Sequence, residues 1–198
     1  MPDPSFESLI SSRLIIRRFA HGDAEALASY RSDSEVARYQ GWTCPCTVDE
    51  ATTFIAKLHG LAPGTPGTWF QFAVCLSSSG ALIGDVALHT TEAEGREAEL
   101  GFTLAAAHHG LGYATEAVQT VLRYAFETLA MQQVWSRTDA RNRRAQRLLE
   151  RLAFRREPEG DERIWFKGAW AVDIRYAQLD SEWRRVRAGG SREAGDFS

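Results

Sequence analysis

The most informative segment of the sequence is His109-Gly110-Leu111-Gly112-Tyr113-Ala114-Thr115-Glu116-Ala117. It separates an apolar, strand-like run, Glu97 to Leu104, from a long amphipathic pattern that starts near Gly112. Two glycines before a helix leave backbone N–H groups uncovered, and the helix N-terminus adds partial positive charge at the same place. The sequence therefore predicts a site for a phosphate or pyrophosphate. A glycine turn that caps the helix without any ligand is the alternative.

Two nucleotide-binding motifs fit this turn poorly. A Walker loop closes with Gly-Lys-Ser/Thr, and no lysine follows Gly112. The dinucleotide fingerprint needs a third glycine, but Tyr113 or Ala114 stands at that position. It also needs an acidic residue at the end of the next strand, and the candidate at that distance, Glu127, lies inside the predicted helix. A nucleotide-dependent enzyme is therefore the least favoured of three function classes.

Composition indicates one globular domain. The chain has 198 residues, of which 44% are hydrophobic and 25% charged, and its net charge of −3 gives no overall attraction to nucleic acid or anionic lipid. It has no run of ~18 apolar residues and no signal-peptide pattern, so we expect no membrane partner and a cytoplasmic location. Cys44, Cys46 and Cys75 suggest neither disulfides nor, without a second Cys or His pair at ligand spacing, a metal site.

Hydrophobic periodicity predicts alternating strands and helices in one domain over residues 1–186. The tail, residues 187–198, is Gly-rich and polar, and we expect it to be disordered. The predicted strands are Arg13–Phe19, Trp69–Leu76, Ala81–His89, Glu97–Leu104, Gln133–Thr138, Ile164–Phe166 and Trp170–Leu179; the helices are Asp23–Arg31, Thr47–His59, Gly112–Leu129 and Asn142–Leu152; residues 61–68 are a loop and residues 90–96 a polar turn. This order is typical of a mixed α/β (α+β) sheet with helices on both faces.

Five motifs in this order resemble the GNAT superfamily of acyl-CoA-dependent N-acyltransferases, and among them the RimJ/RimL type. They are Ser12 to Arg17, Val36 to Trp42, Glu99-Leu100-Gly101-Phe102, His109 to Ala114, and Asp139 to Phe154, followed by Trp170-x-x-Asp173 and Glu182-Trp183. The resemblance covers residues 11–183. It implies a twisted, mostly antiparallel sheet of about seven strands that splays at a central parallel pair.

The resemblance also implies where acetyl-CoA would bind. The pantetheine arm would lie between the strands Glu97–Leu104 and Gln133–Thr138 and pair with backbone groups of Phe102, Thr103 and Leu104. The pyrophosphate would meet the turn, namely His109, Gly110, Leu111, Gly112, Tyr113, Ala114 and Thr115. Asn142 either binds the arm or merely caps its helix. Among the arginines of Asp139 to Phe154, Arg144 or Arg147 is the candidate phosphate contact, although a solvated helix face explains most of them.

Acyl transfer to an amine needs a base, an oxyanion donor and a route for the leaving thiolate. Glu99 is the candidate base. Glu97, two residues away on the same strand face, is an alternative base or a group that binds a cationic substrate. Two positions depart from the family pattern, because Leu149 replaces a tyrosine acid and Ala145 a serine. Ser136 or Tyr113 could supply the acid instead, or the thiolate could leave without one.

The acceptor site is the least readable part of the sequence. Tyr39, Trp42 and Asp85 are candidate substrate contacts, each with a plain packing role as the alternative. The acceptor is a primary amine, either a protein N-terminus or a small molecule. The missing tyrosine and serine keep a second class open, a non-catalytic CoA-binding or regulatory module. The tryptophans near the end of the chain, Trp165, Trp170 and Trp183, could pack in the core of a monomer or form the interface of a homodimer.

Overall fold

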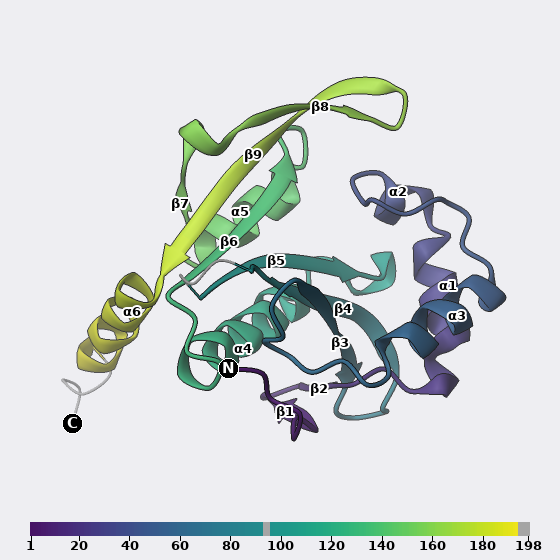
Figure 1. Ribbon diagram of the computed structural model, residues 1–198, viewed down its shortest axis with the longest axis horizontal. Coiled ribbons are helices and arrows are strands. Elements are labelled where there is room, and N and C mark those ends of the chain that lie inside the picture. Colours follow the sequence, from purple (N-terminus) through teal and green to yellow (C-terminus); the bar gives the residue numbers. More distant parts are fainter. Residues whose placement is uncertain (93–95, 194–198) are drawn as a thin grey trace.

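The computed structural model describes residues 1–92 and 96–193, with the backbone alone for residues 189–193 (Figure 1). Its helices are α1 Ala24–Arg31, α2 Ser34–Ala37, α3 Val48–Leu58, α4 Tyr113–Glu127, α5 Arg143–Arg151 and α6 Asp180–Glu193, with short 3-10 turns η1 His21–Asp23, η2 Ala106–His108 and η3 Pro158–Gly160. Its strands are β1 Ser8–Ile10, β2 Leu14–Arg17, β3 Thr68–Leu76, β4 Leu82–Thr90, β5 Glu97–Leu104, β6 Gln133–Asp139, β7 Arg155–Arg156, β8 Glu162–Phe166 and β9 Ala169–Leu179.

One sheet holds all nine of these strands, in the order β1-β2-β3-β4-β5-β6-β9-β7, with β8 also paired to β9. The pairs are antiparallel except for β5 and β6, which run parallel. The mixed sheet with one parallel pair is confirmed. The expected count of about seven strands is wrong, because β1 and β7 have only three and two residues and are too short to carry a periodic pattern.

Helices cover both faces of the sheet, as predicted (Figure 1). Alternating residues of β3 show this, since Phe72 and Val74 belong to the core beneath α4, whereas Ala73 and Cys75 belong to the core beneath α1 and α3. Within the described residues, no helix has the length and apolar character needed to cross a membrane.

The C-terminal part departs from expectation. Residues 187–193 were predicted to be disordered, but they continue helix α6, which extends to Glu193; residues 194–198 lie outside the described residues. The early turns of this helix are anchored to the body of the protein, because Trp183 is buried in the main core. The polar turn predicted over residues 90–96 includes residues 93–95, which also lie outside the described residues.

Candidate active site

The two parallel strands separate at a fork. β5 and β6 pair only through Glu97–Gln133, Ala98–Val134 and Glu99–Trp135. At the next position the Ser136 hydroxyl donates a hydrogen bond of 2.8 Å to the Leu100 carbonyl oxygen. Beyond this fork the strands diverge, so the splayed pair is confirmed, and Ser136 satisfies the first carbonyl that β6 leaves without a strand partner.

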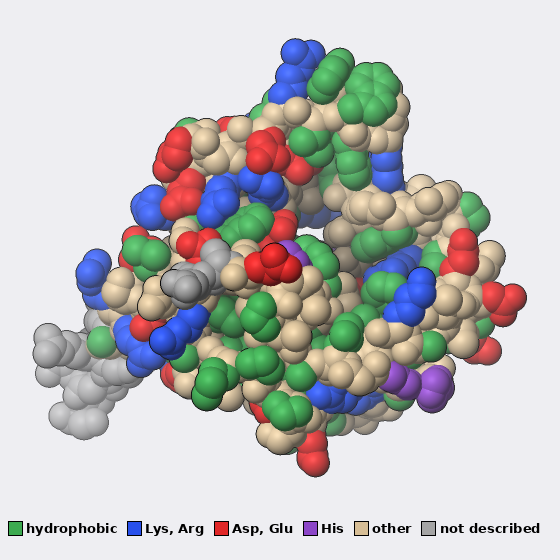
Figure 2. Space-filling model, in the orientation of Figure 1, with side chains coloured by type: hydrophobic (Ala, Val, Ile, Leu, Met, Phe, Trp, Pro, Cys, Tyr) green, Lys and Arg blue, Asp and Glu red, His purple; other side chains and the backbone are tan. Residues whose placement is uncertain are grey.

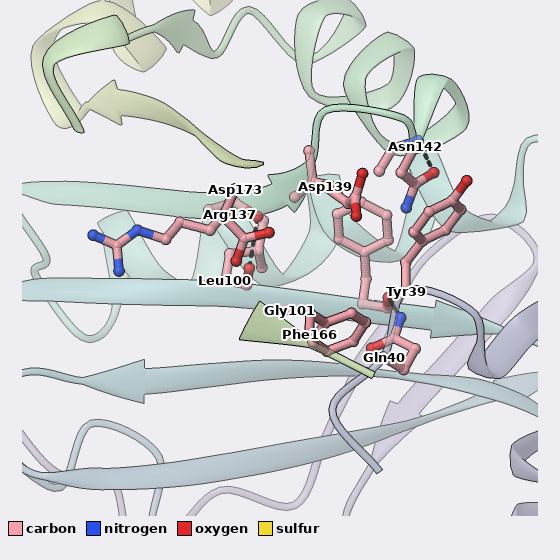
Figure 3. A pocket seen from close by; sticks show the side chains of 13 residues that line it. Tyr39, Gln40, Leu100, Gly101, Arg137, Asp139, Asn142, Phe166 and Asp173 are labelled. Carbon is pink, nitrogen blue, oxygen red and sulfur yellow. Dashed lines mark hydrogen bonds between the residues drawn. The ribbon is translucent and has the colours of Figure 1, made fainter. Parts of the chain in front are cut away.

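A cavity of about 130 Å³ opens between the separated strands (Figure 3). Figure 2 shows the molecule hollowed between the part that contains β8 and β9 and the part that contains α1 to α3. The cavity is lined by Leu100, Gly101 and Phe102 of β5, Ser136, Arg137, Thr138 and Asp139 of β6, Asn142 and Ala145 next to α5, and Tyr39, Gln40, Phe166 and Asp173.

One edge of β5 faces this gap. Backbone groups of successive strand residues point to opposite sides, and the Leu100 carbonyl faces β6. The N–H and C=O groups of Phe102 and Leu104 therefore face the gap as well. Thr103, a predicted cofactor contact, points its backbone to β4, where it is paired with Asp85, and its side chain is buried. We call the Phe102 and Leu104 backbone the open edge of β5.

The glycine turn has the geometry that its sequence predicts. Gly110 and Gly112 have φ angles of 76° and 82°, in the left-handed region, and Gly112 is the N-cap residue of α4. Gly112 has no side chain with which to cap this helix end. The N–H groups of the first turn, which begins with Tyr113, Ala114 and Thr115, are thus directed out of the helix start.

Arg13 supports the turn, a role that the sequence did not reveal. Its Nη1 donates to the Leu111 carbonyl oxygen at 3.0 Å, and its guanidinium lies 4.4 Å from the centre of the Tyr113 ring. Glu116 fixes Arg13 in turn, accepting hydrogen bonds of 2.7 Å from its backbone N–H and from its Nε. These bonds hold the pKa of Glu116 below its usual range despite partial burial.

Helix α5 presents arginines to the same turn. Arg144 Nη1 lies 3.2 Å from His109 Nδ1, and Arg151 Nη1 donates to the Thr115 hydroxyl at 3.2 Å. Arg147 is three residues after Arg144 and four before Arg151, so it shares their helix face. Its side chain is exposed. Arg144 and Arg151 therefore contact the turn where an anion was predicted, and Arg147 lies between them on the same helix face.

Asn142 acts as a cap. Its Oδ1 accepts a hydrogen bond of 3.2 Å from the Ala145 N–H at the start of α5, and it also lines the cavity (Figure 3). The two roles are compatible, because within the described part of the chain the amide bonds only through its oxygen, and the Nδ2 group is left to donate. Ala145 itself lines the cavity, and Leu149 is fully buried in the core.

Glu99 lies at the closed end of the fork, where β5 is still paired on both sides. Its cross-strand partners are His89 of β4 and Trp135 of β6. Burial raises the pKa of its carboxyl, while the charges of Arg137, His89 and Arg175 act in the opposite direction. Glu97 is on the same face, two residue pairs further from the cavity, opposite Gln133.

The structure separates the three predicted acceptor contacts. Tyr39 lines the cavity. Trp42 does not, because its ring lies 4.6 Å from the Arg31 guanidinium and its Nε1 donates to the Arg31 carbonyl oxygen. Asp85 is buried beneath α1, where it accepts a hydrogen bond of 2.5 Å from the Tyr30 hydroxyl. Of the three, only Tyr39 is thus among the residues that line the cavity.

Several residues that line the cavity had no role assigned from the sequence, among them Gln40, Phe166 and Asp173. Gln40 donates through Nε2 to the Phe102 carbonyl oxygen at 3.3 Å, while Phe166 and Asp173 come from the β8–β9 hairpin. Lys167, in the turn of that hairpin, donates to the Ala37 carbonyl oxygen at 2.7 Å and ties the hairpin to α2. In the sequence, Gln40 falls within the motif Val36 to Trp42 and Asp173 within Trp170-x-x-Asp173, whereas Phe166 belongs to none of the motifs.

Comparisons with known proteins agree with this architecture. A profile of the acetyltransferase (GNAT) domain matches residues 13–155. The chain is 30% identical over 151 residues to "Uncharacterized N-acetyltransferase p20" of Bacillus licheniformis, covering 76% of this chain and 84% of that protein.

Solved structures give the same result. A GNAT family acetyltransferase from Bacillus anthracis is similar with a TM-score of 0.78 at 27% identity, covering 88% of this chain and 99% of that one. The ribosomal-protein-S5-alanine acetyltransferase of Vibrio fischeri shares the fold, with a TM-score of 0.74 at 20% identity over 89% and 98% of the two chains. With a matching domain profile, a curated N-acetyltransferase relative and the forked sheet, the chain belongs to the GNAT family of N-acetyltransferases.

Proposed function

We propose that the protein transfers the acetyl group of acetyl-CoA to a primary amine, by direct attack within a ternary complex. The observation that carries this proposal is the continuity of the site. The cavity at the fork, the open edge of β5 and the N–H groups after Gly112 follow one another along the chain. A long ligand with an anionic end and an amide-rich arm matches that order of groups.

Each part of acetyl-CoA has a matching part of the site. The pyrophosphate accepts hydrogen bonds from the N–H groups of residues 110–115, and Arg144, Arg147 and Arg151 balance its charge. The amide-rich arm accepts hydrogen bonds from the open edge of β5, and Asn142 donates through Nδ2. The thioester then lies in the cavity at the fork.

The reaction needs the amine nitrogen to lose a proton before it attacks. Glu99 accepts that proton, directly or through a water, and its raised pKa brings it closer to the working range of a base. The nitrogen forms a bond to the thioester carbon, and the oxyanion accepts a hydrogen bond from the Phe102 N–H. The carbon–sulfur bond then breaks, and the nitrogen gives up its second proton to water. The sulfur leaves as a thiolate, because the Ser136 hydroxyl already donates to Leu100 and Leu149 has no proton to give.

A thiol-release assay tests this proposal. Acetyl-CoA is incubated with the protein and a panel of amines, and free CoA is measured. Wild-type protein is expected to release thiol with at least one amine, and Glu99→Gln to slow release by ~tenfold or more with little change in CoA affinity. Glu159→Gln, an exposed carboxylate in η3, serves as the control. Unchanged turnover in Glu99→Gln would reject Glu99 as the base.

A second candidate is a CoA-binding module without catalysis, favoured by Leu149 and Ala145 at the two positions that depart from the family pattern. Tight CoA binding in calorimetry, without thiol release on any amine, supports that alternative. For either function we propose a cytoplasmic location, since Cys44, Cys46 and Cys75 are all free thiols, as is usual in a reducing compartment.

A further inference from the structure

Asp173 lies on the cavity wall opposite the open edge of β5, and the proposed chemistry does not use it. It is half-buried on β9, where its Cα partners are Asp139 of β6 and Glu162 of β8. Figure 3 shows Asp173 and Asp139 on the same side of the cavity, with Phe166 and Gln40 across from them.

The two aspartates of this wall differ in their partners. Asp139 is neutralised by Arg141, whose Nε and Nη2 donate to it at 2.8 and 2.5 Å, and these bonds hold its pKa below the usual range. No side chain or backbone group within the described residues makes a hydrogen bond or ion pair with the Asp173 carboxylate. Burial and the charge of Asp139 raise the pKa of Asp173. Asp173 is thus a carboxylate without a counterion, beside a carboxylate that has one.

Arg137 does not serve as the counterion of Asp173. It is the single cation among the described lining residues, but its Nη2 donates to Glu162 at 2.6 Å, and its guanidinium lies 5.2 Å from the centre of the Trp135 ring. Figure 3 shows the guanidinium directed away from the cavity. Its charge acts on Asp173 from a distance without a direct bond.

The other residues that line the cavity favour a cationic ligand over an anionic one. Tyr39 and Phe166 present aromatic rings, which attract a positive charge at their faces, and Gln40 and Asn142 are neutral amides. An ammonium group in this cavity would meet one unpaired carboxylate. A ligand that also carries a carboxylate would place it near Asp173 and Asp139, and like charges brought together in a partly buried site repel each other.

We infer that Asp173 binds the ammonium group of the acceptor, and that it thereby selects primary amines without a neighbouring carboxylate over free amino acids. This inference rests on the proposed function, because it treats the cavity as the acceptor site. It makes Asp173 the residue that holds the amine before Glu99 receives its proton. The two carboxylates then divide the work, since one binds the charged amine and the other removes its proton.

A binding experiment tests this inference without any turnover. The protein is loaded with CoA, which carries no acetyl group, and titrated in a calorimeter with alanine amide, alanine and 1,4-diaminobutane. Alanine amide and alanine differ only at the carboxyl group. The wild type is expected to bind alanine amide ~tenfold or more tightly than alanine. The diamine shows whether the preference extends to small amines that lack a peptide-like amide.

Substitutions decide whether Asp173 causes the preference. Asp173→Asn keeps the shape of the side chain and is expected to reduce the difference between alanine amide and alanine to about twofold or less. Asp173→Ser serves the same purpose if the first variant unfolds at a lower temperature. Asp180→Asn is the matched control, because that carboxylate pairs with Arg184 on α6. Equal binding of the amide and the acid by the wild type, or a preference that persists in both Asp173 variants, overturns the inference.

Turnover separates this inference from the proposed function. With acetyl-CoA present, Asp173→Asn should raise the KM for amines and leave the KM for acetyl-CoA unchanged, a split that a general loss of structure would not produce. Wild-type protein that binds alanine amide but never releases thiol contradicts the proposed function alone. Wild-type protein that acetylates alanine and alanine amide equally well contradicts the inference alone.

Discussion

Ala153 ends helix α5 in a conformation that suits glycine, and replacing it with glycine should stabilise the protein. Its φ angle is 62°, in the left-handed region. The Ala153 N–H donates to the Glu150 carbonyl oxygen and the Phe154 N–H to the Leu149 carbonyl oxygen, both at 3.0 Å. These two bonds form a Schellman motif, in which Ala153 is the residue that usually is glycine.

The expected gain in the free energy of unfolding of Ala153→Gly is the difference between two opposing effects. A left-handed conformation costs an L-residue about 1–2 kcal/mol, and glycine is free of that cost. Glycine in turn loses about 0.4–1 kcal/mol more backbone entropy on folding than alanine. Ala153 is exposed, so removing its methyl group leaves no cavity. The difference predicts about 0.5–1 kcal/mol of added stability, or a rise in Tm of about 1–4 °C for a chain of this size.

Thermal and urea unfolding measure this directly. Ala56→Gly is the matched control, because Ala56 is exposed in the last turn of α3, in helical conformation, where the same change should cost up to about 1 kcal/mol. The change to glycine is expected to raise the free energy of unfolding at Ala153 and to lower it at Ala56. A lower Tm for Ala153→Gly, or equal losses at both sites, would refute the assignment of strain to Ala153.

Three further predictions concern the site. If Glu99 is the base, kcat/KM should fall with decreasing pH through a pKa above the usual glutamate range, because only the deprotonated carboxylate accepts a proton. A pH–rate profile measures this acidic limb, and Glu99→Gln should remove it. Gly84→Ala should destabilise the protein by about 2 kcal/mol or more in urea unfolding, because its Cβ would lie 2.2 Å from the Thr103 carbonyl oxygen. Glu116→Gln should weaken CoA binding in calorimetry by releasing Arg13 from the glycine turn, and it should lower stability at neutral pH. Since the folded-state pKa of Glu116 is lowered, the stability difference should be present above its unfolded pKa and vanish as pH falls through the folded one.

Local patterns in the sequence predicted those elements whose own residues form a recognisable motif or hydrophobic periodicity. The glycine turn and the apolar stripe of α4 each follow from a few neighbouring residues. β1 and β7 were missed because a strand of two or three residues forms through pairing with a longer strand, not through a pattern of its own. Residues 187–193 were misjudged because they extend a helix whose earlier turns are fixed by Trp183.

The acceptor side could not be predicted, because it depends on contacts between distant segments. Asp85 follows a strand glycine and looks accessible in the sequence, yet its carboxylate is buried by Tyr30, which lies 55 residues away. Gln40 reaches Phe102 across 62 residues. Asp173 enters the cavity only because β9 pairs with β6 along its full length, up to Asp139. No local spacing encodes such contacts.

The open edge of β5 offers hydrogen-bond donors selectively. A strand edge without a neighbour exposes both N–H and C=O groups. Here the carbonyls of Leu100, Phe102 and Leu104 each accept from a side chain, namely Ser136 at 2.8 Å, Gln40 at 3.3 Å and His109 at 2.8 Å.

The partners of His109 assign its tautomer. Nε2 donates to the Leu104 carbonyl oxygen, so the neutral ring keeps a lone pair on Nδ1, which accepts from Arg144. With the carbonyls satisfied, the N–H groups of Phe102 and Leu104 are what the edge presents to a ligand. A ligand that only accepts hydrogen bonds enters without displacing a side chain, whereas one that donates must compete with Gln40 and His109. The edge therefore favours carbonyl groups, such as those of an amide arm and a thioester, over hydrogen-bond donors.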